Sequence, residues 1–179
     1  MRQIAIIGLG PSQKDAPVYS SYWEKWGLPW DGNFGAYDRG FEMHDRALWE
    51  TRNVNYLDRL RDSAVPVYMQ TSHSDIPASV AYPLKDVVAV TGDYFGSSAA
   101  YMIGMAIIEK PARIGVWGID LVDCYDHQRP NFEYLLGLAR GLGIDVYVHP
   151  ESSLLRLRLE DTFNGKTVAY PVRYGQEAA

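Results

Sequence analysis

Titratable side chains gather in one short loop of this sequence, directly after a run that predicts a buried strand. The apolar run at 113–117 leads into Gly118-Ile119-Asp120, and the next seven residues include Asp123, Tyr125, Asp126 and His127. A histidine has an unperturbed pKa of about 6.5, so His127 in such a loop could act as a general base at neutral pH. The alternative is that His127 is an ordinary surface histidine.

A second candidate site is the turn Gly8-Leu9-Gly10-Pro11-Ser12, which follows an apolar run at 3–8. Glycines let the backbone turn tightly and approach a ligand, and Ser12 could cap a helix whose N-terminal N–H groups point at a phosphate. A dinucleotide fingerprint would need another glycine where Gln13 stands, so NAD is disfavoured. The segment is interpreted as a phosphate-binding turn. It is otherwise a strand-to-helix turn that needs glycine for its geometry alone.

Two further sets of polar residues have candidate roles. Ser97 and Ser98 begin an apolar helical segment, where their hydroxyls and the free backbone donors could hold a phosphate or a ribose, or simply cap the helix. His44 and Asp45 follow a short strand-like run and could line the same pocket.

A metal site is not predicted from these residues. Asp120, Asp123 and His127 are separated by three and four positions, and this spacing resembles no defined metal-binding loop.

The elements that must position these residues alternate between strands and helices. Pro66 and the pair Gly141 and Gly143 provide stop signals after two of the helical patterns. Asn164-Gly165 lies between alternating residues, which predicts a short C-terminal β-hairpin. Strands are expected at 3–8, 23–28, 40–43, 67–69, 113–117 and 144–148, and helices at 53–64, 97–108 and 132–139, with a loop and one helical turn across 71–95.

This alternation predicts an α/β, Rossmann-like fold: an open, mostly parallel sheet with helices on both faces. In such sheets the ligand crevice lies outside the carboxyl ends of the strands. The turn at Gly8 and the loop after Asp120 are therefore expected to face one shared crevice.

Length and composition narrow the classes of protein. The 179 residues suit one domain, 1–179, and the formal net charge of −5 disfavours nucleic-acid binding through a basic field. No apolar stretch approaches a membrane span, and the single cysteine, Cys124, suits a reducing cytoplasm. A small-molecule partner is expected, and homo-oligomerisation stays open.

The order of these motifs resembles the small bacterial lipooligosaccharide sialyltransferases. The residues that carry the resemblance are the Gly8–Ser12 turn, the Ser97-Ser98 helix start, the strand ending Gly118-Ile119-Asp120, the loop His127, and Pro150-Glu-Ser-Ser-Leu-Leu155. The chain is similar as well to their Rossmann-like relatives, including the archaeal dihydropterin pyrophosphokinases, and to short Rossmann-like proteins common in phage genomes, which would place it in a host cytoplasm.

The resemblance implies a metal-independent glycosyltransferase that needs no cofactor beyond its nucleotide-sugar substrate. The donor phosphate would lie against the glycine turn and Ser97 and Ser98, Asp120 would orient the ribose or shape the crevice, His127 would deprotonate the acceptor and Tyr125 would hydrogen-bond the phosphate. Two alternatives remain. One is Mg²⁺-dependent pyrophosphoryl transfer, with Asp120 and Asp123 holding the ion, and the other is nucleotide sequestration without catalysis, since Leu9 stands where the family has a nucleotide-contacting Asn.

Overall fold

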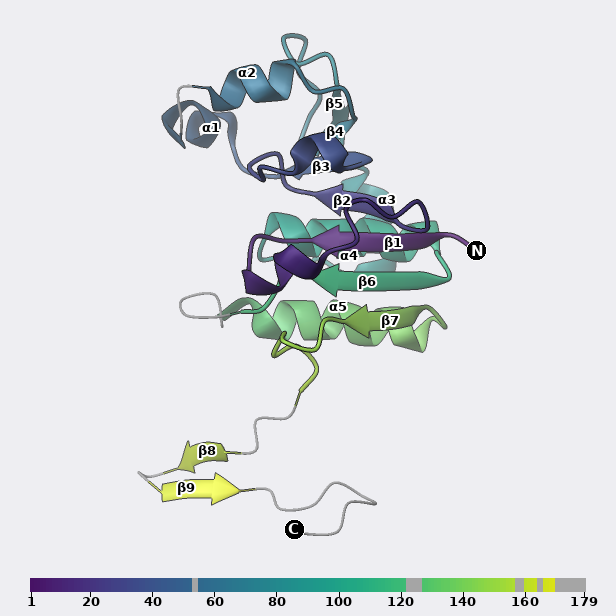
Figure 1. Cartoon of the computed structure of the whole chain (residues 1–179), viewed down its shortest axis with the longest axis vertical. Helices are drawn as coiled ribbons and strands as arrows, with labels where there is room; N and C mark the ends of the chain where they lie inside the picture. The colour runs from purple at the N-terminus through teal and green to yellow at the C-terminus, as the bar shows by residue number, and fades with distance from the viewer. Residues whose placement is uncertain (53–54, 122–126, 157–159, 164–165, 170–179) are drawn as a thin grey trace.

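A seven-stranded, all-parallel sheet forms the centre of the protein in the computed structural model, which describes residues 1–52, 55–121, 127–156, 160–163 and 166–169 (Figure 1). The strand order is β5-β4-β3-β2-β1-β6-β7. The strands are β1 (Gln3–Ile7), β2 (Glu24–Gly27), β3 (Arg39–Glu42), β4 (Val67–Met69), β5 (Ser79–Ala81), β6 (Arg113–Trp117) and β7 (Asp145–Val148). A separate antiparallel pair, β8 (Glu160–Phe163) and β9 (Lys166–Ala169), forms the expected hairpin.

Side chains of the central strands alternate between two apolar cores, as the period of a strand requires. Ile4 and Ile6 of β1 face the core that contains α3 (Leu84–Thr91), α4 (Ser98–Glu109) and α5 (Arg129–Gly141). Ala5 and Ile7 face the opposite core, which is closed by η1 (Pro11–Asp15), η2 (Phe34–Ala36), α1 (Arg46–Arg52) and α2 (Tyr56–Arg61). Helices therefore cover both faces, and the predicted α/β class is confirmed.

Four elements differ from the sequence-based expectation. The segment 71–95 is not a loop with one helical turn, since it contains strand β5 and the two-turn helix α3. The helix expected at 53–64 is shorter, and α1 precedes it. Strand β5 is an edge strand whose side chains are mostly exposed, so it lacks the apolar run by which the inner strands can be recognised.

Among the described residues no helix is both long and apolar enough to cross a membrane.

An ion-pair network at the amino ends of the strands anchors the C-terminus of α4. Glu109, the last residue of α4, accepts hydrogen bonds from Arg2 and from Arg39 at the start of β3, at 2.5 and 2.7 Å. Both guanidinium groups also pair with Glu24 of β2, and that of Arg39 lies 4.7 Å from the ring centre of Trp26. The opposite end of α4 is thereby directed toward the carboxyl edge of the sheet.

We expect Glu109→Gln to lower the free energy of unfolding by about 1 kcal/mol, because it weakens two partly buried pairs within one network. Arg113→Gln is the control, since it removes an isolated pair with Asp145 whose side chains are about half exposed, and it should cost less than about 0.5 kcal/mol. Urea denaturation of both variants provides the measurement. Losses of equal size would contradict a special role for the network.

Candidate functional site

A pocket of about 900 Å³ opens at the carboxyl edge of the sheet, bounded by the ends of β1, β3 and β6 and by the N-terminus of α4. Its wall is largely apolar and includes three aromatic side chains, whereas its polar groups come from the strand ends and from the start of α4. The lining residues are Gly8, Leu9, Gly10, Pro11, Leu28, Trp30, Phe41, Glu42, His44, Ser97, Ser98, Ala99, Gly118, Ile119, Asp120, Leu121, Gln128 and Phe132. The two segments expected to share a crevice, around Gly8 and Asp120, therefore meet here.

The buried carboxylate of Asp120 joins the end of β6 to the turn after β1. It accepts a hydrogen bond from the Ser12 N–H at 2.7 Å and one from the Ser12 hydroxyl at 2.5 Å. The same hydroxyl accepts a hydrogen bond from the Gly118 N–H at 2.8 Å. Ser12 and Asp120 are 0% and 4% exposed, so these charge-assisted bonds are shielded from water.

Two glycines allow the backbones of these turns to touch. The Gly8 N–H donates to the Trp117 carbonyl and the Gly10 N–H to the Gly118 carbonyl, both at 2.8 Å. A Cβ atom on Gly8 would lie 2.3 Å from the Gly118 carbonyl oxygen, and Gly118 has a φ of +66°. Close approach at Gly8 and left-handed backbone at Gly118 both favour glycine.

These contacts change the expected role of the glycine turn. Gly8, Gly10, Pro11, Gly118 and Asp120 all line the pocket, as expected of ligand-binding residues. The N–H groups of Gly8, Gly10 and Ser12, however, already donate within the protein, and the carboxylate of Asp120 occupies the N-terminus of η1. Ser12 itself is buried behind that carboxylate, so these three amides do not form a phosphate cradle.

The N-terminus of α4 presents backbone donors to the pocket instead. Ser97 is the N-cap residue, and its hydroxyl accepts a hydrogen bond from the Ala100 N–H at 3.3 Å. The Ser98 hydroxyl accepts a hydrogen bond from the Met43 N–H at 3.4 Å, which joins α4 to the end of β3. The N–H groups of Ser98 and Ala99 donate to no acceptor in the part of the chain that the structure describes, and both residues line the pocket.

A histidine–carboxylate pair lies at the end of β3. The Nδ1 atom of His44 is 2.5 Å from Oε1 of Glu42, which also accepts a hydrogen bond from the His44 N–H at 3.0 Å. The Tyr56 hydroxyl donates to Oε2 of Glu42. Burial alone would raise the pKa of Glu42, but the hydrogen bonds from His44 and Tyr56 outweigh it and hold this pKa below its ordinary value. Glu42 is therefore a buried carboxylate at neutral pH.

The remaining predicted residues lie outside the pocket wall or outside the described residues. Asp45 is exposed, and its carboxylate accepts a hydrogen bond from the Gln70 side chain at 3.1 Å. His127 is exposed too, and the neighbouring Gln128 lines the pocket in its place. Tyr125 and Asp123 lie outside the described residues.

Glu42 and the aromatic wall were not predicted as site residues from the sequence. A charged residue at the end of an otherwise buried strand was the one local signal for Glu42. Trp30, Phe41 and Phe132 have no such signal, because an aromatic residue in a core segment and one in a pocket wall look alike in sequence.

The comparisons with known proteins agree with this architecture. No protein-family model matches the chain, and no curated protein is significantly similar to it. Among solved structures, the chain is similar to the sialyltransferase CstII from Campylobacter jejuni in complex with a substrate analogue, cytidine-5'-monophosphate. The TM-score is 0.55 at 17% identity over 86% of this chain and 82% of that one.

The chain has a sialyltransferase-like fold.

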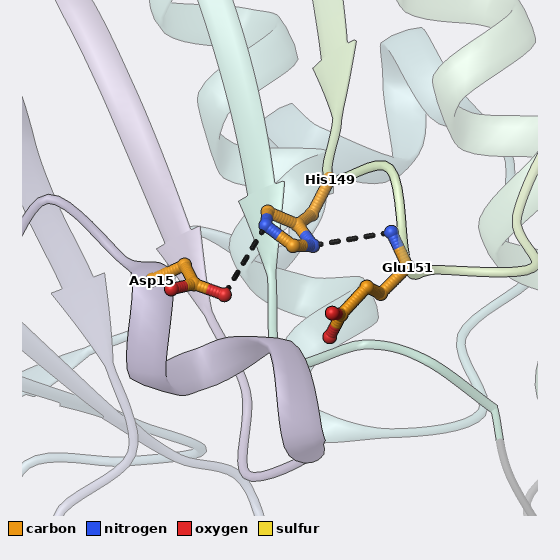
Figure 2. A group of neighbouring side chains, drawn as sticks. All are labelled: Asp15, His149 and Glu151. Carbon is orange, nitrogen blue, oxygen red and sulfur yellow. Dashed lines mark hydrogen bonds and ion pairs between the residues drawn. The ribbon is translucent and has the colours of Figure 1, made fainter.

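Outside the pocket of this sialyltransferase-like fold, Figure 2 shows a second group of potential ligands, in which His149 lies between Asp15 of η1 and Glu151. The Nδ1 atom of His149 accepts a hydrogen bond from the Glu151 N–H at 3.2 Å, and its Nε2 atom lies 3.5 Å from the Asp15 carboxylate. The neutral ring therefore carries its proton on Nε2. A metal bound at Nε2 would require that proton on Nδ1 instead. The arrangement therefore favours a structural role over metal binding, with His149 linking η1 to the segment after β7.

We expect Ser12→Ala to lower the free energy of unfolding by about 2–3 kcal/mol, because it leaves a buried carboxylate oxygen and the Gly118 N–H without their shared partner. Ser152→Ala is the matched control. Ser152 is equally buried, but its hydroxyl contacts only neutral partners among the described residues, donating to the Ile119 carbonyl and accepting from the Leu154 N–H at 3.3 Å, so its loss should cost about 1 kcal/mol. Urea denaturation measures both. A loss from Ser12→Ala no larger than that of the control would contradict the role given to this contact.

Proposed function

We propose that this protein is a glycosyltransferase that binds a nucleotide-activated sugar in the 900 Å³ pocket and transfers the sugar to a hydroxyl acceptor. The fold supports the class of reaction, since the similar CstII structure is that of a sialyltransferase with cytidine-5'-monophosphate bound. The pocket supports the class of ligand, because aromatic walls suit a base or sugar ring and unpaired backbone donors suit a phosphate. The single observation that carries the proposal is the exposure of the α4 N-terminus to this pocket.

The donor phosphate would bind at Ser98 and Ala99. Their N–H groups lie in the first turn of a 12-residue helix, where the aligned peptide dipoles favour negative charge. The Ser97 cap and the Ser98–Met43 contact hold this turn in place before any ligand arrives. Such preorganised donors stabilise the negative charge that develops on a leaving phosphate, and this stabilisation would account for much of the rate.

The charges of the pocket favour a donor with one phosphate. Among the lining residues that the structure describes none is Lys or Arg, whereas Glu42 and Asp120 both contribute carboxylates. A diphosphate or triphosphate would therefore meet uncompensated repulsion unless a cation accompanied it. Asp120 is held by Ser12 on both of its oxygens, an arrangement that disfavours it as a ligand for Mg²⁺. A nucleoside monophosphate sugar needs no metal under this scheme.

Ser98→Pro tests the phosphate site by deleting one backbone N–H. Proline is compatible with this first helical position, and the preceding Ser97 has the extended backbone that a following proline requires, with φ −167° and ψ 162°. Ser98→Ala is the matched control, because it removes the same hydroxyl and keeps the N–H. We expect Ser98→Pro to bind CMP at least about tenfold more weakly than Ser98→Ala in calorimetric titration, since a hydrogen bond to a charged group is lost.

Equal affinities of the two variants for CMP, with both folded by thermal melting, would contradict the placement of the phosphate. Release of CMP from a CMP-activated sugar by the unmodified protein tests the reaction itself. Binding of that sugar without any turnover would instead support a nucleotide-sequestering protein.

A further inference from the structure

A histidine and a buried carboxylate at the end of β3 occupy the pocket beside the phosphate site. Both His44 and Glu42 line the pocket, and the intervening Met43 donates its N–H to the Ser98 hydroxyl at the start of α4. The Gln70 side chain donates to the Met43 carbonyl at 2.8 Å and to the Asp45 carboxylate at 3.1 Å, so it links the residues on either side of His44. Residues that could take up a proton therefore lie one hydrogen bond away from the helix that would hold the phosphate.

The contacts of this pair have the form of a base and its orienting partner. Oε1 of Glu42 accepts from both the backbone N–H and the Nδ1 atom of His44, and Oε2 accepts from Tyr56. With its Nδ1–H held by the carboxylate, neutral His44 has its lone pair on Nε2. A buried carboxylate in this position also stabilises the imidazolium that forms when Nε2 takes a proton. The His44 side chain is 41% exposed, whereas that of Glu42 is 1% exposed.

We propose that His44 is the general base of the transfer reaction and that Glu42 is its positioning residue, an inference that rests on the function proposed above. As the acceptor oxygen forms its bond to the anomeric carbon, its proton passes to Nε2 of His44. The bond between the anomeric carbon and the phosphate oxygen breaks, and its electron pair leaves on the nucleoside monophosphate. The imidazolium then releases the proton to solvent, so that donor and alcohol become glycoside, nucleoside monophosphate and one proton.

This assignment differs from the one that the sequence favoured. His127 comes from the expected loop, but its side chain is exposed and it does not belong to the pocket wall. His44 belongs to that wall and contacts a carboxylate that is already charged. Geometry therefore favours the residue after β3 over the residue after β6.

The test compares His44→Gln with His127→Gln in the full chain, using CMP-N-acetylneuraminic acid as the donor probe and following CMP release to water or to added lactose. His44→Gln should lower kcat by at least about 100-fold, the usual contribution of a general base, while calorimetry shows the affinity for CMP changed by less than about threefold. His127→Gln should retain most of the kcat. Thermal melting confirms that each variant is folded.

Glu42→Gln separates positioning from packing, because it keeps the volume and removes the charge. It should lower kcat about tenfold and change the His44 tautomer from Nδ1–H toward a mixture, as seen in long-range ¹H–¹⁵N spectra. A tautomer that is unchanged would show that the carboxylate does not orient the ring and would overturn its role.

The outcomes separate this inference from the proposed function. If the unmodified protein releases CMP and His44→Gln does so at a similar rate, the assignment of His44 is wrong and the transferase proposal stands. If the loss falls on His127→Gln instead, the base is His127. If the unmodified protein binds CMP but releases none from the donor, the proposed reaction is wrong and the assignment of His44 fails with it.

Discussion

The buried hydrogen bonds between Asp120 and Ser12 determine how the carboxyl edge of the sheet is built. They join residues 108 positions apart and bring the turn after β1 against the end of β6. A carboxylate that is 4% exposed is stable there only because Ser12 supplies both an N–H and a hydroxyl, while Gly118 completes the network. The N–H groups of Gly8, Gly10 and Ser12 all donate within this contact, so they are not available to a phosphate as those of a glycine-rich turn could be. The N-terminus of α4, the next element at this edge, keeps N–H groups at Ser98 and Ala99 that donate to no acceptor among the described residues.

The topology of the sheet places that helix and the end of β3 around one crevice. The chain moves outward from β1 to β5 and then returns to add β6 on the other side of β1, so the strand order reverses beside β1. A crevice at such a reversal is the usual ligand site of an open parallel sheet. The ion pairs of Glu109 fix one end of α4, and the contact of Ser98 with Met43 fixes the other. The Ser98 and Ala99 amides and the pair of Glu42 and His44 are thus held by these packed elements.

The sequence was sufficient for the elements that are buried on both sides. Continuous apolar runs predict β1 and β6, and the apolar segment after Ser97 predicts α4. It was insufficient for β5 and α1, since an exposed edge strand and a seven-residue helix have too little apolar periodicity to stand out.

The site shows the same division between local and long-range information. The positions of Gly8 and His44 at the pocket follow from strand ends, and that of Ser98 follows from a helix start, which local patterns reveal. Local patterns do not reveal the hydrogen bond between Ser12 and Asp120 or the one between Tyr56 and Glu42. Each joins residues that are distant in sequence. Only the folded chain shows that the N–H groups of the glycine turn already donate within the protein and that a histidine after β3 contacts a buried carboxylate.

The most direct test of this account is a titration of the ¹⁵N-labelled protein with CMP, followed through the backbone amide shifts. The account predicts that the largest changes fall on the Ser98 and Ala99 amides, while those of Gly8, Gly10 and Ser12, which already donate within the protein, change little. Large changes at the glycine turn with none at the start of α4 would contradict it.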